Sequence, residues 1–325
     1  MTSITQNNHT KIEFKYEEAF KNIKNEVNRV LSSAPKIIRE YTRHLSTTTG
    51  KFLRASSLLI CAQDDKGFIQ QNAIILASAI EILHLATLVH DDVIDHADIR
   101  RGVVTLQKKY GNRTAVICGD YLLSVSLKMV ASASEKEEYL DRKIPDFVGR
   151  VCLGELNQQI NNGNYDLSVF QYLKIIAGKT AGMFEAAFFA GASLVEKDEV
   201  VIKKYARIGR YVGMIFQLTD DCMDFETTKN IAKKPVQSDY EKNVITLPLI
   251  HTFKKLEDFK NKAKEQRLTR AEINIMVRKA GGLLYTRIFA KKYYNKAVDS
   301  LQKLEITEDK REKIMSIIDK AYRVF

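Results

Sequence analysis

Apolar residues recur along this chain three and four positions apart, which is the spacing of amphipathic and buried helices. Only 15 glycines and 4 prolines interrupt the 325 residues, so we predict an all-α protein of long helices. The sequence shows no linker or short repeat, and residues 14–325 are therefore expected to form one domain after a flexible polar segment at 1–13. Helices are predicted over 14–31, 68–95, 115–133, 144–161, 169–190, 200–225 and in the part from 245 onward.

The helix predicted over 68–95 ends in a cluster of acidic residues. His84, Asp91 and Asp95 are spaced by seven and four positions, so they share one stripe of the helix. Two carboxylates one turn apart repel each other unless a cation neutralises them, and oxygen ligands of this kind suit Mg²⁺. Taken alone, the cluster fits a solvated acidic helix end equally well.

The helix predicted over 200–225 ends in the same pattern, shortly after Gln217. Asp220 and Asp224 again share a face. Two long apolar helices that each end in Asp-Asp-x-x-Asp favour metal binding far more strongly than either cluster alone. The candidate metal ligands are Asp91, Asp92, Asp95, Asp220, Asp221 and Asp224.

Basic residues stand where an anion would bind. Lys51 and Arg54 follow a glycine turn at the start of a helix, where the helix dipole disfavours cations unless an anion is bound. Arg100 and Arg101 follow the first acidic cluster and suit bidentate contacts with phosphate oxygens. Lys179 interrupts an apolar helix face; it is either a surface lysine with a buried stem or a functional residue.

This combination of charges predicts diphosphate chemistry. Several Mg²⁺ ions on two carboxylate stripes need an anionic bridge, and the basic residues supply more charge than one diphosphate requires. The sequence shows no glycine-rich nucleotide loop, Ser-His-Asp set or cysteine nucleophile. We therefore expect a metal cluster that stabilises a diphosphate as it leaves carbon or is attacked.

Composition adds expectations about partners and location. The formal net charge of +11 favours anionic partners, but the dispersed lysines and the lack of a recognised motif argue against nucleic acid. The four widely spaced cysteines are expected to be buried reduced thiols: Cys61, Cys118, Cys152 and Cys222. The apolar run 73–89 is interrupted by Glu81 and His84 and is expected to be a core helix rather than a membrane span, in a cytoplasmic protein.

In their order and spacing these motifs resemble those of trans-isoprenyl diphosphate synthases of the all-trans polyprenyl type. The matching motifs are Gly-Lys-x-x-Arg at 50–54, His-x6-Asp-Asp-x-x-Asp-x4-Arg-Arg at 84–101, Lys-Thr at 179–180 and Phe-Gln-x-x-Asp-Asp-x-x-Asp at 216–224. The similarity covers nearly the whole chain. The chain resembles the catalytic large subunit, or the homodimeric form, of a hepta- or octaprenyl synthase. This resemblance implies a helical bundle around a deep central cavity.

The resemblance implies a head-to-tail transfer of a prenyl group from an allylic diphosphate to isopentenyl diphosphate, with three Mg²⁺ ions per active site. The released diphosphate would then serve as the base. The implied catalytic residues are Asp91, Asp95, Asp220 and Lys179. The implied contacts with the allylic diphosphate are Arg100, Lys179, Thr180 and Gln217, and those with isopentenyl diphosphate are Lys51, Arg54, His84 and Arg101.

Product length is predicted from the helix that carries Asp91, because the growing chain should run down that helix. The positions below the cluster are Thr87, Ala86, Leu83 and Ile82. None of them is a bulky aromatic residue, which the resemblance associates with short-chain enzymes of the family. We predict a product longer than geranylgeranyl, as for a quinone side chain. Peripheral contact with a membrane would then serve product release.

One departure from the family pattern concerns the loop after the second cluster. Asn243 can replace the usual glycine in a left-handed conformation, but Val244 stands where a lysine is usual, so Lys242 or Lys234 is needed as a substitute. A similar loss resembles the catalytic subunits of two-component synthases, so either a homodimer or a complex with a small non-homologous partner is expected.

Other readings remain open at this point. They are a geranylgeranyl synthase, a non-catalytic regulatory subunit, and a metal-dependent phosphohydrolase suggested by the His90-Asp91 pair. The regulatory subunit would be expected to lose aspartates, and the phosphohydrolase needs further histidines with ordered spacing.

Overall fold

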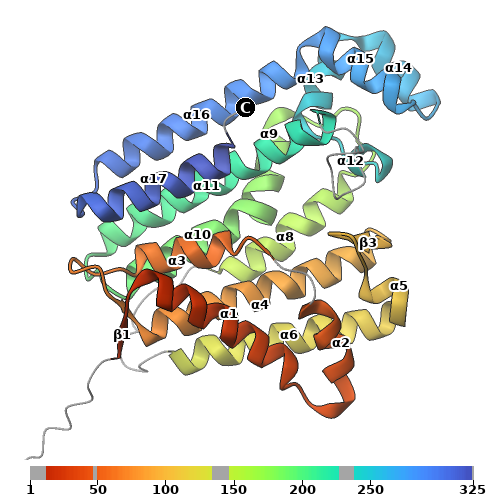
Figure 1. The fold of residues 1–325 in the computed structure, drawn as a ribbon. Coiled ribbons are helices and arrows are strands. Elements are labelled where there is room, and N and C mark those ends of the chain that lie inside the picture. Colours follow the sequence, from red (N-terminus) through yellow and green to blue (C-terminus); the bar gives the residue numbers. More distant parts are fainter. Residues whose placement is uncertain (1–11, 47–49, 134–145, 227–237, 324–325) are drawn as a thin grey trace, which may run out of the picture.

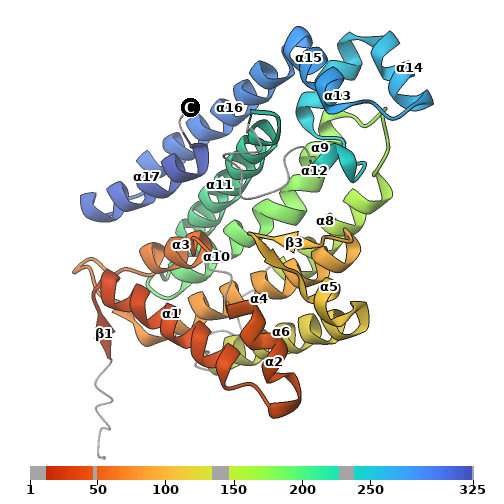
Figure 2. The same cartoon turned by 45° about the vertical axis from the view of Figure 1, so that its right-hand side comes forward.

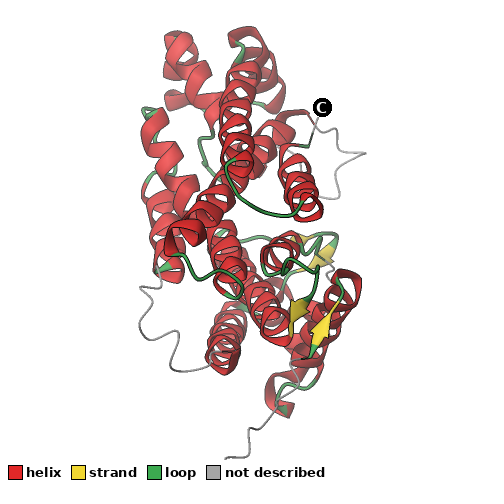
Figure 3. Ribbon diagram, turned by 90° about the vertical axis from the view of Figure 1, so that its left-hand side faces the viewer, coloured by secondary structure: helices red, strands yellow, loops and turns green. Residues whose placement is uncertain are grey.

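The computed structural model describes residues 12–46, 50–133, 146–226 and 238–323, and these parts are almost wholly helical, as Figures 1 and 3 show. The all-α prediction is confirmed. The helices of the first half are α1 (Tyr16–Ser32), α2 (Lys36–Ser46), α3 (Leu53–Cys61), α4 (Gln71–Ile94), α5 (Leu106–Tyr110), α6 (Asn112–Ala133) and α8 (Phe147–Ile160).

The second half of the chain continues the bundle and adds two helices, α14 and α15, that project at one end (Figure 1). Its elements are α9 (Val169–Ile176), the π-helix η1 (Ala177–Ala181), α10 (Gly182–Ser193), α11 (Glu199–Glu226), α12 (Ser238–Glu241), α13 (Leu247–Lys255), α14 (Glu257–Glu265), α15 (Arg270–Ala280), α16 (Gly282–Gln302) and α17 (Glu308–Tyr322). The helix predicted over 169–190 is therefore interrupted by a π-helix.

Two short antiparallel pairs of strands accompany the helices. β1 (Glu13–Phe14) pairs with β2 (Ile69–Gln70), and β3 (Ile99–Arg100) pairs with β4 (Val103–Val104). The first pair explains why α4 begins at Gln71 rather than at 68, and it gives Glu13 of the predicted flexible segment a strand partner.

The two helices with acidic ends lie at the centre of the bundle. α4 packs against α1, α3 and α6, and α11 packs against α10, α16 and α17. This packing buries Ala73, Ala77 and Ile82 of α4 in the first of three clusters of buried apolar residues. By length and composition α4 and α6 could each cross a membrane, but the packing of α4 is that of the predicted core helix.

Three of the four cysteines are buried as predicted, whereas the prediction is wrong for Cys152. This residue lies on α8 next to Leu153 and Leu156, which are also exposed. Gly154 is the buried position of α8, and Cys152 lies on an exposed face of the helix with Leu153, Leu156 and Ile160.

Candidate active site

The first acidic cluster lies at the C-terminal end of α4, and cations hold its carboxylates. Nε of Arg100 donates to Oδ1 of Asp92 over 2.7 Å, and Nζ of Lys242 lies 3.0 Å from Oδ2 of Asp95. Burial raises the pKa of Asp91 to about 6, and the opposing attraction of Lys179 does not cancel this shift. An ionised Asp91 thus favours a cation nearby.

The second cluster lies at the end of α11, where Asp221 is buried. The hydroxyl of Tyr172 and the amide of Gln217 both donate to its carboxylate. Burial nevertheless raises the pKa of Asp221 to about 7, helped by Asp220 and Asp224.

Asp220 has a different partner from Asp221. Nη1 of Arg323, beyond the end of α17, lies 3.3 Å from Oδ1 of Asp220, and the same guanidinium lies over the ring of Phe216. The second cluster is therefore contacted by the C-terminal part of the described chain.

The helix α12, which is labelled below α13 in Figure 2, and the turn after it border both clusters. Its Asp239 faces the second cluster: burial and then Asp224, Asp221 and Asp220 raise the pKa of Asp239 well above its usual range. One residue beyond α12, Lys242 reaches the first cluster at Asp95. The two acidic helix ends therefore border the same region.

The π-helix η1 also borders both clusters. Lys179 pairs with Glu155 of α8, with 2.6 Å between Nζ and Oε2; burial disfavours its charge, but Asp91 and Glu155 outweigh that effect and raise its pKa. The hydroxyl of Thr180 donates to Oε1 of Gln217 over 2.7 Å. π-Helices are rare and recur at functional sites, and here one places two predicted site residues side by side.

Glycine contacts fix the position of the π-helix. A Cβ on Gly154 would lie 2.3 Å from the backbone nitrogen of Lys179, and a Cβ on Gly213 of α11 would lie 2.4 Å from Cα of Ala181. η1 therefore touches α8 and α11 directly through backbone atoms.

We expect Gly154→Ala to destabilise the protein by about 1–3 kcal/mol, because backbone atoms cannot move aside as a flexible side chain can. It should also lower kcat, since the displaced backbone is that of Lys179. Thermal unfolding and steady-state kinetics measure the two effects. Gly182→Ala is the matched control, because its Cβ would meet its nearest neighbour at an ordinary 3.5 Å; equal behaviour of the two variants would contradict the prediction.

A basic group lies next to the first cluster, where α3 and the hairpin β3–β4 meet α4. Arg101 packs against Gly50, in a left-handed backbone conformation with φ of 52°. Burial lowers the pKa of Arg54 to about 10, and its buried Nε has no hydrogen-bond partner among the described residues. A buried donor of this kind calls for an acceptor such as a phosphate oxygen.

His84 lies in the same basic group and is neutral. Burial first, and then Arg54 and Arg101, lower the pKa of its imidazole well below the usual range. A neutral imidazole can donate one hydrogen bond to an anion without adding to the repulsion among the arginines. Lys51 stands exposed at the edge of the group.

The predicted product-length positions divide into two sets. Thr87 and Leu83 are partly exposed and lie on the face of α4 that carries Asp91, whereas Ala86 and Ile82 are buried in the first apolar cluster. The face continues through two more partly exposed positions, Ile80 and Leu76.

Several residues of the site were not singled out as site residues from the sequence. Tyr172 carried no signal, because a tyrosine in an apolar helix is ordinarily a core residue. Glu155 is a polar residue within an amphipathic helix, and Asp239 lies in the loop after the second cluster. The predicted substrate contact Lys234 lies outside the described residues.

The aspartates of the two clusters suit Mg²⁺, although the described side chains do not by themselves complete its coordination. Six aspartates provide hard oxygen ligands, and the raised pKa values of Asp91 and Asp221 show that neighbouring cations are favourable. Within the described ranges, no group of three histidine, cysteine, aspartate or glutamate side chains is arranged to hold an ion by itself. This agrees with Mg²⁺ sites, which use one or two carboxylates together with water and substrate phosphates.

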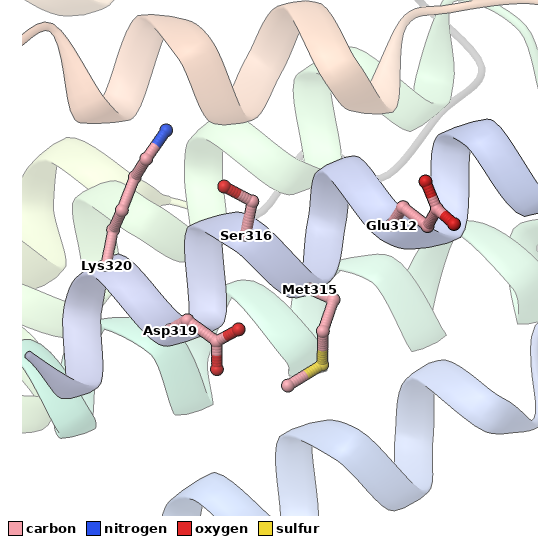
Figure 4. A pocket seen from close by; sticks show the side chains of 5 residues that line it. All are labelled: Glu312, Met315, Ser316, Asp319 and Lys320. Carbon is pink, nitrogen blue, oxygen red and sulfur yellow. The ribbon is translucent and has the colours of Figure 1, made fainter. Parts of the chain in front are cut away.

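A surface depression elsewhere has no part in this arrangement. Figure 4 shows that its lining residues belong to α17 alone: Glu312, Met315, Ser316, Asp319 and Lys320. A smaller cavity lies beneath the first cluster and includes Asp92, Arg100 and Arg101 among its lining residues. The second cavity adjoins the basic group.

Comparisons with known proteins point to one family. A family model described as polyprenyl synthetase matches residues 35–280. The chain is 34% identical over 229 residues to heptaprenyl diphosphate synthase component 2 of Geobacillus stearothermophilus, covering 70% of this chain and 71% of that protein.

Two solved structures have the same fold. Heptaprenyl diphosphate synthase from Staphylococcus aureus superposes with a TM-score of 0.87 at 30% identity, over 96% of this chain and 99% of that one. A polyprenyl synthase from Caulobacter crescentus, complexed with calcium and isoprenyl diphosphate, gives a TM-score of 0.82 at 28% identity, over 95% of each chain.

Proposed function

The chain belongs to the polyprenyl synthetase family and is a trans-prenyl diphosphate synthase, and from this premise we propose that it makes a long-chain all-trans product. In this proposal it condenses an allylic diphosphate with isopentenyl diphosphate repeatedly, past geranylgeranyl length, as for a quinone side chain. Members of the family bind divalent metal, and we propose three Mg²⁺ ions per active site.

The observation that carries the proposal is the pairing of two unlike anion sites. One consists of the acidic clusters with Lys179 and Lys242, which suits a diphosphate bound through metal. The other is the basic group with Arg54, His84 and Arg101, which contains none of the six candidate metal ligands. Two adjoining diphosphate sites are what a reaction between two prenyl diphosphates requires.

When bound at the aspartates, Mg²⁺ would supply positive charge that stabilises the departing diphosphate. Lys179, whose pKa is raised, stays protonated and adds to that stabilisation. Thr180 and Gln217 hold each other, so the amide of Gln217 keeps a fixed orientation beside Asp221.

The basic group holds the second substrate. Arg54 and Arg101 neutralise the isopentenyl diphosphate, and the neutral imidazole of His84 donates a hydrogen bond to it. The double bond of that substrate is then placed to attack the allylic carbon. The released diphosphate is a sufficient base for the final proton, so no side-chain base is required.

The long product is supported by the face of α4 below Asp91. Thr87, Leu83, Ile80 and Leu76 follow one another at spacings of four, three and four, and all are partly exposed. A hydrocarbon chain following this stripe meets no aromatic side chain on it. The predicted deep cavity remains part of this proposal.

We propose a homodimer as the assembly, formed through the solvent-facing side of α6. Ile117 and Leu127 are 64% and 52% exposed there, and Val116 and Val130 are also exposed. The alternative is a complex with a small non-homologous subunit on the same face. We place the enzyme in the cytoplasm, with peripheral membrane contact for release of its product.

The test is to incubate the purified protein with labelled isopentenyl diphosphate, farnesyl diphosphate and Mg²⁺, and to size the products. We expect a ladder that extends beyond geranylgeranyl diphosphate. Geranylgeranyl diphosphate as the sole end product would overturn the long-chain proposal. No product from the protein alone would favour an obligatory partner.

A further inference from the structure

We propose that Lys242 is a further diphosphate-binding residue of this site and makes the contact that Val244 cannot make. This inference rests on the proposed function, because it assigns Lys242 to the diphosphate of the allylic substrate. The two positions lie in the same loop, and the side chain of Val244 has no hydrogen-bond donor.

The first observation is the reach of Lys242. Its backbone belongs to the turn after α12, yet its ammonium lies 3.0 Å from Oδ2 of Asp95 at the end of α4. Both side chains are partly buried, with exposures of 31% and 21%, so the pair is not a freely solvated surface contact. Lys242 thus extends from the segment bordering the second cluster to the carboxylate of the first.

The second observation is that hydrogen bonds fix the backbone of this turn. The N–H of Lys242 donates to the carbonyl of Asp239, and the N–H of Val244 donates to the same carbonyl. Asn243 between them has a φ of 61°, and its carbonyl accepts from the N–H of Gly163 over 2.7 Å. The backbone on both sides of the left-handed residue is therefore held in place, and from this turn the side chain of Lys242 reaches Asp95.

The third step concerns charge. Asp95 is a candidate Mg²⁺ ligand, and a divalent cation bound there would repel the ammonium of Lys242. The nearest anion would then be the diphosphate shared with the same ion. A lysine side chain is long and flexible, so its ammonium can move from carboxylate to diphosphate while the backbone stays in place.

Other cations near the first cluster already have partners that do not depend on this turn. Arg100 is bound to Asp92, and Lys179 is bound to Glu155. Arg100 and Lys242 are both paired with candidate metal ligands, but Lys242 is the one that comes from the segment bordering the second cluster.

The experiment measures binding of the unreactive analogue farnesyl thiolodiphosphate with Mg²⁺ by calorimetry. Lys242→Ala should weaken binding of the analogue about tenfold, the loss of one charge-assisted contact. Unchanged binding would overturn the proposal. Tighter binding would also overturn it, because Lys242 would then only compete with the metal for Asp95.

A second variant tests whether the lysine can be relocated. Val244→Lys, added to Lys242→Ala, should restore the affinity to within about threefold of the wild type. A folded double variant, verified by thermal unfolding, that still binds weakly would contradict the exchange of the two positions. Lys203→Ala is the control, because Lys203 pairs with Glu199 near the start of α11 and should leave binding unchanged.

The outcome is separable from that of the proposed function. Analogue binding that depends on Lys242, in a wild-type protein that forms no long product, would sustain this inference and overturn the long-chain proposal. A wild-type product ladder together with unchanged binding in Lys242→Ala would do the reverse.

Discussion

Replacing Asp91 by asparagine should reduce kcat on the order of 10³-fold and, in the presence of EDTA at pH 8, raise the free energy of unfolding. The first effect follows from the loss of a charged metal ligand. The second follows because burial raises the pKa of Asp91 to about 6, so its ionised form costs stability in the folded state. Activity and stability should therefore change in opposite directions.

The sign of the pH dependence follows from the same shift. A carboxyl with a raised pKa contributes stability below its unfolded pKa, about 4, and loses that contribution as the pH rises through about 6. Chemical denaturation in EDTA should show the wild type losing roughly 1–3 kcal/mol more than Asp91→Asn between pH 4 and pH 8. Lys179 keeps its pair with Glu155 in the variant.

The matched control is Asp98→Asn. Asp98 is exposed just beyond the first cluster, where it pairs with Lys108. This variant should keep its activity and its pH profile of stability. If Asp91→Asn retained more than about a tenth of the wild-type kcat, the assignment of Asp91 as a metal ligand would fail.

The second large effect concerns the product. Thr87→Phe should shorten the product ladder, because it places an aromatic ring on the face of α4 one turn below Asp91. Leu83→Phe should block the same stripe about one turn, or 5.4 Å, further down. Its products should therefore be about one five-carbon unit longer than those of Thr87→Phe. Chromatographic sizing of the products measures both.

Ala86→Phe, at another of the positions predicted below the cluster, should also shorten the product, but at a cost in stability. Ala86 is buried in the first apolar cluster, and overfilling such a position costs about 1–3 kcal/mol. Leu284→Phe, at an exposed position of α16, is the control and should leave the ladder unchanged. An unchanged ladder in all three α4 variants would remove α4 from the determination of length.

The acidic clusters and the helices that carry them could be predicted because their signals are local. Asp91 and Asp95, like Asp220 and Asp224, share a face through helical spacing alone, and the apolar residues before them specify long core helices. His84 could be identified by its helical spacing to Asp91, and Arg54 by its position after the glycine turn at the start of a helix.

Features that depend on contacts between distant segments could not be predicted. The contact of Tyr172 with Asp221 joins positions 49 residues apart, and Lys242 meets Asp95 across 147 residues. The exposure of Cys152 follows from which face of α8 its neighbours cover. The division between Thr87 and Ala86 follows from which side of α4 faces the first apolar cluster.

The π-helix could not be predicted from the sequence because, apart from Lys179 and Thr180, its residues continue the apolar pattern of a single helix. A π-turn contains one residue more than the α-turn it replaces, so the lysine after Gly178 has a direction that an uninterrupted helix would not give it. A one-codon deletion in Ala177–Ala181 would remove that extra residue and change the direction of Lys179. In evolutionary terms, this segment is where a lineage could lose the chemistry while keeping the fold.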